Sequence, residues 1–180
     1  MFPYALTDDA ALHLLQPHHA EELFALVVQN RAGLRAWMPW VDDIRTVESI
    51  QEFIARMQAE QADTGNPTAV IMVRERLAGV IGIHPIHWND RKTSLGYWLG
   101  AEFQGQGLMT RACRAMVHYA LVEEGLNRVE ITAATGNARS RSIPERLGFT
   151  HEGCMRQAQW LYDHFVDLEL YAMLREEWER

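Results

Sequence analysis

The chain has 180 residues, of which 48% are hydrophobic and 23% are charged, and its net charge is −7. This length and composition are typical of one globular domain, which we expect to span residues 1–180. The acidic charge argues against nucleic-acid binding, which needs a basic surface, and no apolar run approaches the ~18 residues that a membrane span requires.

The N-terminal ten residues contain two aspartates and no basic residue. This composition is not typical of a signal peptide, so a cytoplasmic location is expected. Only two cysteines are present, Cys113 and Cys154, and they cannot form a disulfide framework. Neither has neighbours that suggest a nucleophile.

The first third of the sequence is predicted to be mostly helical. A weak strand near residues 12–15 precedes a segment, residues 20–28, in which apolar residues recur at helical spacing. A second helix is predicted to begin after Thr46, a residue type that commonly caps helices. The connection between the two helices contains Trp37 and Trp40.

The middle of the chain has the pattern of strands. Residues 68–74 and 77–86 are β-branched and apolar and read as a hairpin. Residues 93–99 form the third strand of this meander. A glycine-rich loop, residues 100–107, follows directly.

The second half of the chain alternates helices and strands. A helix is predicted from Met109 to a stop at Gly125, because apolar residues again recur at helical spacing. The remaining predicted elements are a strand at 128–133, a helix at 137–147 and two strands at 149–155 and 165–174. The sequence therefore predicts an α+β or mixed α/β domain with helices that can cover both faces of the sheet.

The most informative motif is the segment QGQGLMT, residues 104–110, between a strand and an amphipathic helix. Its glycines permit a sharp turn, and the backbone amides from Gln106 to Thr110 would face one small volume at a helix N-terminus. Such a site favours an anion, and a pyrophosphate is the natural ligand. No Gly-Lys-Ser/Thr ending and no third glycine is present, so neither a P-loop nor a dinucleotide fingerprint fits.

A second pattern follows the next predicted strand: Asn137 with Ser140, and then the tripeptide Leu147-Gly148-Phe149. With these two halves in order, the chain resembles the GCN5-related N-acetyltransferases (the GNAT family). The stretches GYWLG, FQGQGLMT, HEGCMRQA and LRAWMPWV resemble its RimJ/RimL branch, which acetylates N-terminal amines, notably of ribosomal proteins. The resemblance implies the GNAT fold, a mixed, mostly antiparallel twisted sheet of about seven strands with about four helices.

The resemblance also implies how acetyl-CoA is bound. The loop grips the pyrophosphate, the backbone of Trp98 and Leu99 pairs with the pantetheine arm where the strand splays from its neighbour, and Asn137 adds a hydrogen bond. The implied loop residues are Gln104, Gly105, Gln106, Gly107, Leu108, Met109 and Thr110. Acetyl-CoA is the expected co-substrate.

Two positions depart from the family pattern. Met109 stands where the signature has glycine or alanine, so its side chain must point into the core if binding is to survive. Pro144 stands where many members have a tyrosine that protonates the leaving thiolate, and proline should kink the short helix or delay its start.

The proton donor and the base are therefore open questions. Ser140 is the candidate proton donor to the CoA sulfur, and the alternative is an ordinary serine near a helix N-terminus that caps a turn. The candidate bases by residue type are His84, Glu130, Glu152 and Asp167.

Among the candidate bases His84 is favoured by its place on a strand near the family's central cleft, although a strand histidine is often satisfied locally. His84 and His87 lie an odd number of residues apart, which places them on opposite faces of a regular strand. This spacing and the lack of a paired-histidine motif argue against a metal site.

The acceptor side is least determined. Trp37 and Trp40 form either a lid over the acceptor groove or ordinary core packing, and Gln159 can orient a water but cannot take a proton. The three arginines in residues 139–146 either form a solvated helix face or contact a phosphate of the donor.

The leading hypothesis is direct acetyl transfer to the N-terminal α-amine of a protein, without a covalent acetyl-enzyme. A small-amine acetyltransferase acting on a polyamine, amino acid or antibiotic, and a non-catalytic CoA-binding module, remain alternatives. A homodimer is expected only because twofold assemblies are common.

Overall fold

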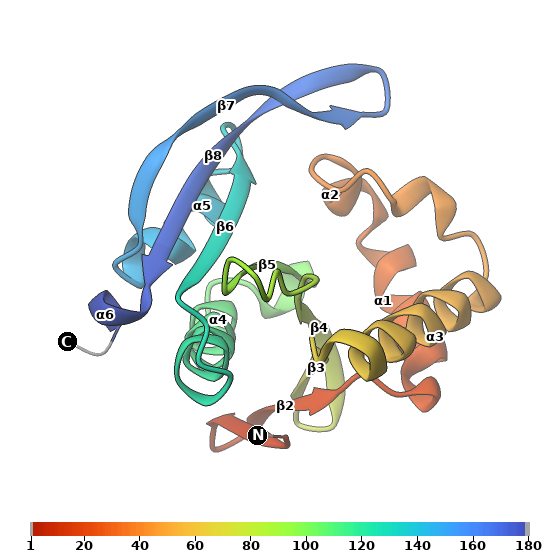
Figure 1. Cartoon of the computed structure of the whole chain (residues 1–180). Coiled ribbons are helices and arrows are strands. Elements are labelled where there is room, and N and C mark those ends of the chain that lie inside the picture. The colour runs from red at the N-terminus through yellow and green to blue at the C-terminus, as the bar shows by residue number, and fades with distance from the viewer. Residues whose placement is uncertain (1, 179–180) are drawn as a thin grey trace.

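Eight strands form one sheet within residues 2–178, the part of the chain that the computed structural model describes, in the order β1-β2-β3-β4-β5-β6-β8-β7 (Figure 1). All neighbouring strands are antiparallel except β5 and β6. The strands are β1 (Tyr4–Thr7), β2 (Ala10–Leu14), β3 (Thr68–Val73), β4 (Arg76–Ile83), β5 (Lys92–Leu99), β6 (Arg128–Ala134), β7 (Thr150–Leu161) and β8 (His164–Leu174). The mixed, mostly antiparallel sheet is confirmed, with eight strands in place of about seven because β1 pairs with β2 at the edge.

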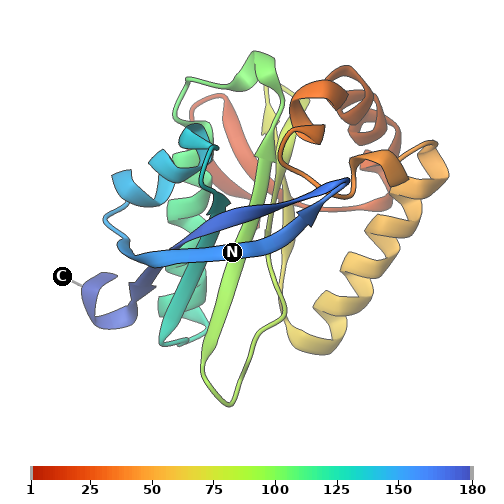
Figure 2. The same cartoon turned by 90° about the horizontal axis from the view of Figure 1, so that it is seen from above.

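The helices lie on both faces of this sheet. α1 (Ala20–Gln29) and α3 (Val47–Thr64) cover one face, and α4 (Leu108–His118) and α5 (Ala138–Arg146) lie on the other (Figure 2). These are the four helices that the sequence predicts. The remaining helical segments are η1 (Pro17–His19), α2 (Arg31–Arg35), η2 (Val41–Asp43), η3 (Ala101–Phe103), the π-turn η4 (Tyr119–Glu123) and α6 (Arg175–Trp178).

Apolar residues at helical spacing hold each helix on its face. In α4, Ala112, Cys113 and Met116 have no exposed surface, and Ile50 and Ile54 of α3 are each 2% exposed. Burying an isoleucine or methionine side chain contributes about 1.5–3 kcal/mol. Cys113 therefore belongs to the core, with the other buried residues of this helix face. Within the described residues, no helix is both long and apolar enough to cross a membrane.

The sheet splits between β5 and β6. The two strands pair in parallel over Lys92–Ser94 and Arg128–Glu130. Beyond this point β5 continues against β4 as far as Leu99, and β6 continues against β8 as far as Ala134. A gap thus opens between the two halves of the sheet, as the family resemblance implies, and it determines where the functional site lies.

Differences from the prediction at β4, β7 and α5 have clear physical reasons. β4 ends at Ile83 because Pro85 follows, whereas the apolar pattern runs to Ile86. β7 extends to Leu161 across a register shift between Met155 and Gln159, which breaks the alternation that marks a strand. α5 begins at Ala138 and continues past Pro144, so the predicted late start is wrong.

Candidate active site

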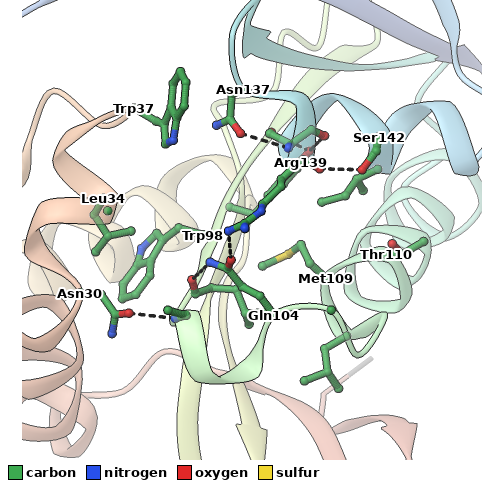
Figure 3. Close-up of a pocket in the computed structure, with 18 of the residues that line it drawn as sticks. Asn30, Leu34, Trp37, Trp98, Gln104, Met109, Thr110, Asn137, Arg139 and Ser142 are labelled. Atoms are coloured by element: carbon green, nitrogen blue, oxygen red, sulfur yellow. Dashed lines mark hydrogen bonds between the residues drawn. The ribbon is translucent and has the colours of Figure 1, made fainter.

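A cavity of about 1080 Å³ occupies the split in the sheet (Figure 3). Its wall is built by the end of α1 with α2, by the end of β5, by the glycine loop with the start of α4, and by the start of α5. The volume suits a cofactor-sized ligand. Three stretches that lie far apart in the sequence, residues 30–38, 97–110 and 137–146, therefore converge on one site.

The glycine loop places backbone N–H groups at the cavity. Gly105 and Gly107 have φ angles of 78° and 74°, a left-handed conformation that glycine adopts without strain. Gly107 caps α4 without a side-chain hydrogen bond, so the amides at the start of the helix have no intrahelical partner. The positive end of the helix dipole lies there too, and the loop is an anion-binding site.

The side chains of the loop have separate roles. Met109 is 6% exposed, which confirms that its side chain points to the core. Gln106 turns away from the cavity, and its amide donates to the carbonyl of Glu102 at 3.3 Å. Gln104 donates to the carbonyl of Leu99 at 3.0 Å and accepts from Arg139 at 2.8 Å. It thus links β5 to α5 across the loop.

The three arginines of α5 divide between two faces. Arg139 and Arg146 line the cavity, and Arg146 donates to the hydroxyl of Thr110 at 3.2 Å. Arg141 instead donates to the hydroxyl of Tyr171 at 3.1 Å. Two guanidinium groups therefore stand beside the amides of the loop. This donor set fits the phosphates of coenzyme A, since guanidinium groups and helix N-termini both bind phosphate.

The exposed edge of β5 offers backbone partners to an extended ligand. The backbone N–H of His84 donates to Ser94 O at 2.9 Å, and that of Gly100 donates to Ala78 O at 2.8 Å. The backbone N–H and C=O groups of the even-numbered residues of β5 therefore point toward β4. In an antiparallel pair the backbone groups of the intervening residues point away from the partner strand. The N–H and C=O groups of Tyr97 and Leu99 therefore face the gap, while Trp98 lines the cavity with its side chain.

Asn137 and Ser140 lie together at the start of α5. The side-chain oxygen of Asn137 accepts from the N–H of Ser140 at 3.2 Å, so Asn137 is the helix cap. The capping role that the sequence left open for Ser140 thus belongs to Asn137. The hydroxyl of Ser140 donates to the hydroxyl of Tyr97 at 3.3 Å, and all three side chains line the cavity.

His84 lies over β5 and, among the described residues, is not part of the cavity wall. Its Nδ1 is 2.8 Å from the hydroxyl of Ser94, and a Cβ placed on Gly96 would come within 2.5 Å of its Nε2. The ring therefore occupies the space above Gly96, two residues before Trp98 on the same face of the strand. Partial loss of solvent lowers the pKa of His84, opposed by the charge of Glu60, so the neutral form is favoured.

The other candidate bases are engaged in ion pairs or hydrogen bonds. Arg128 contacts Glu130 at 2.7 Å and Glu152 at 2.5 Å, and its hydrogen bond lowers the pKa of Glu152. Asp167 accepts from the N–H of Gln157 at 2.7 Å. The carboxylate of Glu152, stabilised in this way, is a weak base. His84 therefore stays the prediction for the base, because the three carboxylates are already engaged.

The two tryptophans of the helix connection have different surroundings. Trp37 lines the cavity, is 37% exposed and lies against Gly136. Trp40 packs against Trp98 with ring centroids 6.1 Å apart. Among the residues described, the cavity wall does not include Trp40, nor Gln159, which lies on β7 opposite Val166.

A bridge crosses from the β7–β8 hairpin to α2 at the rim of the cavity. The hydroxyl of Tyr162 in the hairpin turn donates to the carbonyl of Met38 at 2.6 Å. The guanidinium of Arg35 lies 3.9 Å from the centre of the Tyr162 ring and pairs with Asp42 at 2.9 Å. Figure 1 shows the hairpin tip reaching toward α2.

Several of these residues are not evident from sequence patterns. Tyr97 and Met38 occupy strand and connection positions whose apolar character predicts only packing. Tyr162 becomes part of the site through a contact with a residue 124 positions away. Arg139 and Arg146 differ in this respect, because a phosphate contact is one of the two interpretations that the sequence gives for the arginines of residues 139–146.

The split sheet, the anion-binding loop at the start of α4 and the cavity between them define a transferase that takes an acyl group from a coenzyme A thioester. The chain belongs to the GNAT family, because the model of the acetyltransferase (GNAT) domain matches residues 10–150. It is an acetyl-CoA-dependent N-acetyltransferase.

Similar proteins include ribosomal N-acetyltransferases and an acetyltransferase of another kind. The Bacillus subtilis (strain 168) protein YdaF, whose name places it among ribosomal N-acetyltransferases, is 36% identical over 99% of this chain and 98% of its own. The structure of RimL, a ribosomal L7/L12 alpha-N-protein acetyltransferase in complex with coenzyme A, matches with a TM-score of 0.91 and 25% identity, covering 96% of this chain and 98% of that one. The microcin C7 self-immunity acetyltransferase MccE, in complex with acetyl-CoA and AMP, matches with a TM-score of 0.90 and 26% identity over 97% of each chain.

Proposed function

We propose that this enzyme acetylates the N-terminal α-amine of a protein, by direct attack of the amine on the thioester. The observation that carries the proposal is the bridge between Tyr162 and Met38 at the cavity rim. Because these contacts hold the hairpin against α2, a polypeptide cannot lie across the rim as a continuous strand, whereas the end of a chain can be inserted. The RimL and YdaF names are consistent with such an acceptor.

Acetyl-CoA is held by backbone groups and by two arginine side chains. The amides at the start of α4, with Arg139 and Arg146, bind the phosphates, and the backbone groups of β5 that face the gap pair with the pantetheine arm. Acetyl-CoA supplies the activated acetyl group. The N–H of Leu99 faces the gap and stabilises the negative charge that develops on the thioester oxygen as the amine attacks.

Proton transfer falls to two side chains. The hydroxyl of Ser140 gives its proton to the departing sulfur and takes one back from water. His84, neutral because its pKa is lowered, accepts the proton of the attacking amine through water.

The acceptor's own acidity makes a weak base sufficient. An α-amino group has a pKa of ~7.7–8.0 and a lysine of ~10.4, so deprotonation at pH 7 costs about 1 kcal/mol for the first and about 4.6 kcal/mol for the second. A neutral histidine acting through water is adequate for the α-amine. This argues for an N-terminus over a lysine side chain.

A second candidate is a small amine-bearing acceptor, such as a polyamine, amino acid or antibiotic. The match to MccE, with a TM-score of 0.90 against 0.91 for RimL, favours keeping this alternative because the fold does not separate the two acceptor classes.

The test is a comparison of acceptors under identical conditions. Release of the CoA thiol is measured with a peptide that begins with serine or alanine, with the same peptide blocked at its N-terminus and carrying an internal lysine, and with spermidine and an aminoglycoside. We expect the free-N-terminus peptide to be the best substrate by kcat/KM and to gain the mass of one acetyl group. A preference for spermidine or the aminoglycoside would refute the proposal.

A further inference from the structure

Pro144 removes a hydrogen bond from the middle of α5. Proline has no backbone N–H, so the carbonyl four residues earlier, that of Ser140, loses the donor that an α-helix normally supplies. The hydroxyl of Tyr97, on β5, lies 3.2 Å from this carbonyl oxygen and donates to it. A strand side chain thus supplies the hydrogen bond that the helix cannot make.

The same tyrosine also contacts the side chain of Ser140. A phenol has a single proton, and Tyr97 uses it on the Ser140 carbonyl, so its oxygen is left to accept from the Ser140 hydroxyl at 3.3 Å. Two contacts to one residue fix both the backbone and the hydroxyl direction of Ser140. Because both residues line the cavity, this pair points into the site.

The tyrosine is itself held firmly. Its ring packs against the buried core beside α4, and this burial raises the pKa of Tyr97, so the hydroxyl stays protonated and remains a donor. Its backbone N–H and C=O face the gap in the sheet. The strand that aligns the donor therefore also places the hydroxyl of Ser140.

We propose that Tyr97 is a positioning residue, which replaces the helix hydrogen bond removed by Pro144 and thereby holds the hydroxyl of Ser140 toward the departing sulfur. The inference rests on the proposed role of Ser140 as proton donor. During transfer, the Ser140 hydroxyl hydrogen turns from Tyr97 to the sulfur while Tyr97 keeps its bond to the Ser140 carbonyl. The S–H bond forms as the Ser140 O–H bond breaks, and Tyr97 itself gains and loses no proton.

The test is a set of four proteins: wild type, Tyr97→Phe, Pro144→Ala and the double variant. Steady-state kinetics are measured with the best acceptor of the wild type. Tyr97→Phe should lower kcat by about tenfold to a hundredfold, a range typical of a misplaced catalytic group, with the KM for acetyl-CoA unchanged within about twofold.

The double variant gives the decisive result. Alanine at position 144 restores an N–H that can donate to the Ser140 carbonyl, so adding Pro144→Ala to Tyr97→Phe should recover most of the lost kcat. Pro144→Ala alone should leave kcat near that of the wild type. Thermal unfolding of all four proteins separates recovered positioning from recovered folding. A double variant that folds but stays as slow as Tyr97→Phe, or a Tyr97→Phe variant with normal kcat, overturns the proposal.

Ser140→Ala separates this proposal from the proposed function. If Tyr97 acts through Ser140, adding Tyr97→Phe to Ser140→Ala should lower kcat no further, and a further loss overturns the positioning role. A fully active Ser140→Ala variant would instead remove the proton-donor role of Ser140, and with it the basis of this inference. The choice of acceptor is decided independently by the acceptor comparison.

Discussion

Arg139 donates a hydrogen bond of 2.8 Å from its guanidinium to the side-chain oxygen of Gln104, and this contact joins α5 to the loop that precedes α4. Gln104 is held in turn by the carbonyl of Leu99 at 3.0 Å. The positive charge is therefore fixed beside the anion-binding amides before the substrate arrives. Figure 3 shows this chain of contacts along one wall of the cavity.

Replacing Arg139 with glutamine should weaken the binding of acetyl-CoA. Hydrogen bonds to charged groups contribute about 1.5–3 kcal/mol, which corresponds to a rise of about tenfold to a hundredfold in the KM for acetyl-CoA. The kcat should change little, because Arg139 binds phosphate and not the reacting atoms. Arg56→Gln, on the exposed surface of α3, removes the same charge away from the cavity and is the control. Equal KM values for the two variants would contradict a phosphate-binding role.

The loop glycine Gly107 can be tested against a glycine of the same conformation elsewhere. Gly107 has a φ of 74° and Gly65, which ends α3, a φ of 80°, and a Cβ would meet no atom within 4 Å at either position. Alanine at either position should therefore destabilise the fold by a similar amount, about 1–2 kcal/mol. Only Gly107→Ala should also raise the KM for acetyl-CoA, because its methyl group stands where the phosphates approach.

Thermal unfolding and steady-state kinetics of the two variants decide this point. An unchanged KM in Gly107→Ala, at a stability loss equal to that of Gly65→Ala, would mean that the loop does not approach the donor closely.

How far the sequence predicts this structure depends on the range of each interaction. The stripe that includes Ala112, Cys113 and Met116 predicts a buried helix face because the pattern is local, and the glycine loop is recognisable for the same reason. The sequence does not predict β1, because this short edge strand lacks an alternating pattern and is followed at once by a turn that contains Asp8 and Asp9.

The surroundings of the proposed catalytic residues depend on contacts between distant residues. The bond between Tyr97 and Ser140 joins residues 43 positions apart, and no periodicity in either segment predicts it. The sequence identified Pro144 as a departure, but its consequence appears only when β5 lies beside α5. Likewise, the place of His84 over Gly96 follows from the register of β4 and β5, which a one-residue slip would change.

The titration of His84 should affect the pH dependence of both the free energy of unfolding and the kcat/KM for the acceptor. Because its folded-state pKa is lowered from 6.5, the folded protein keeps His84 neutral in a window below pH 6.5 where the unfolded chain is already protonated. In that window the unfolded state binds more protons, so the free energy of unfolding should fall as the pH falls. The kcat/KM for the acceptor should fall as well, when the pH passes the folded-state pKa and the base is lost.

His84→Gln should abolish this acidic limb in both measurements and lower kcat at neutral pH. The limb caused by the acceptor's α-amine, near pH ~7.7–8.0, should remain in all variants. His87→Gln serves as the control, since His87 lies in the following turn and does not lie over Gly96. A His84→Gln enzyme with an unaltered acidic limb in its pH–rate profile would exclude His84 as the base.

The bridge between Tyr162 and Met38 should govern acceptor choice. Tyr162→Phe removes the hydroxyl that donates at 2.6 Å but keeps the ring beneath Arg35, so the hairpin is loosened and the stacking is retained. A hydrogen bond of this kind contributes about 0.5–1.5 kcal/mol. We therefore expect the KM for an N-terminal peptide to rise by up to about tenfold, with the KM for acetyl-CoA unchanged.

The more specific consequence concerns internal lysines. If the fastened hairpin is what excludes a continuous strand, loosening it should raise the activity on a peptide with a blocked N-terminus and an internal lysine relative to the free-N-terminus peptide. Tyr4→Phe, an exposed tyrosine on β1, should leave both activities unchanged. Unchanged selectivity in Tyr162→Phe, with a measurable loss of hairpin order by amide hydrogen exchange, would mean that the bridge stabilises the hairpin without selecting the acceptor.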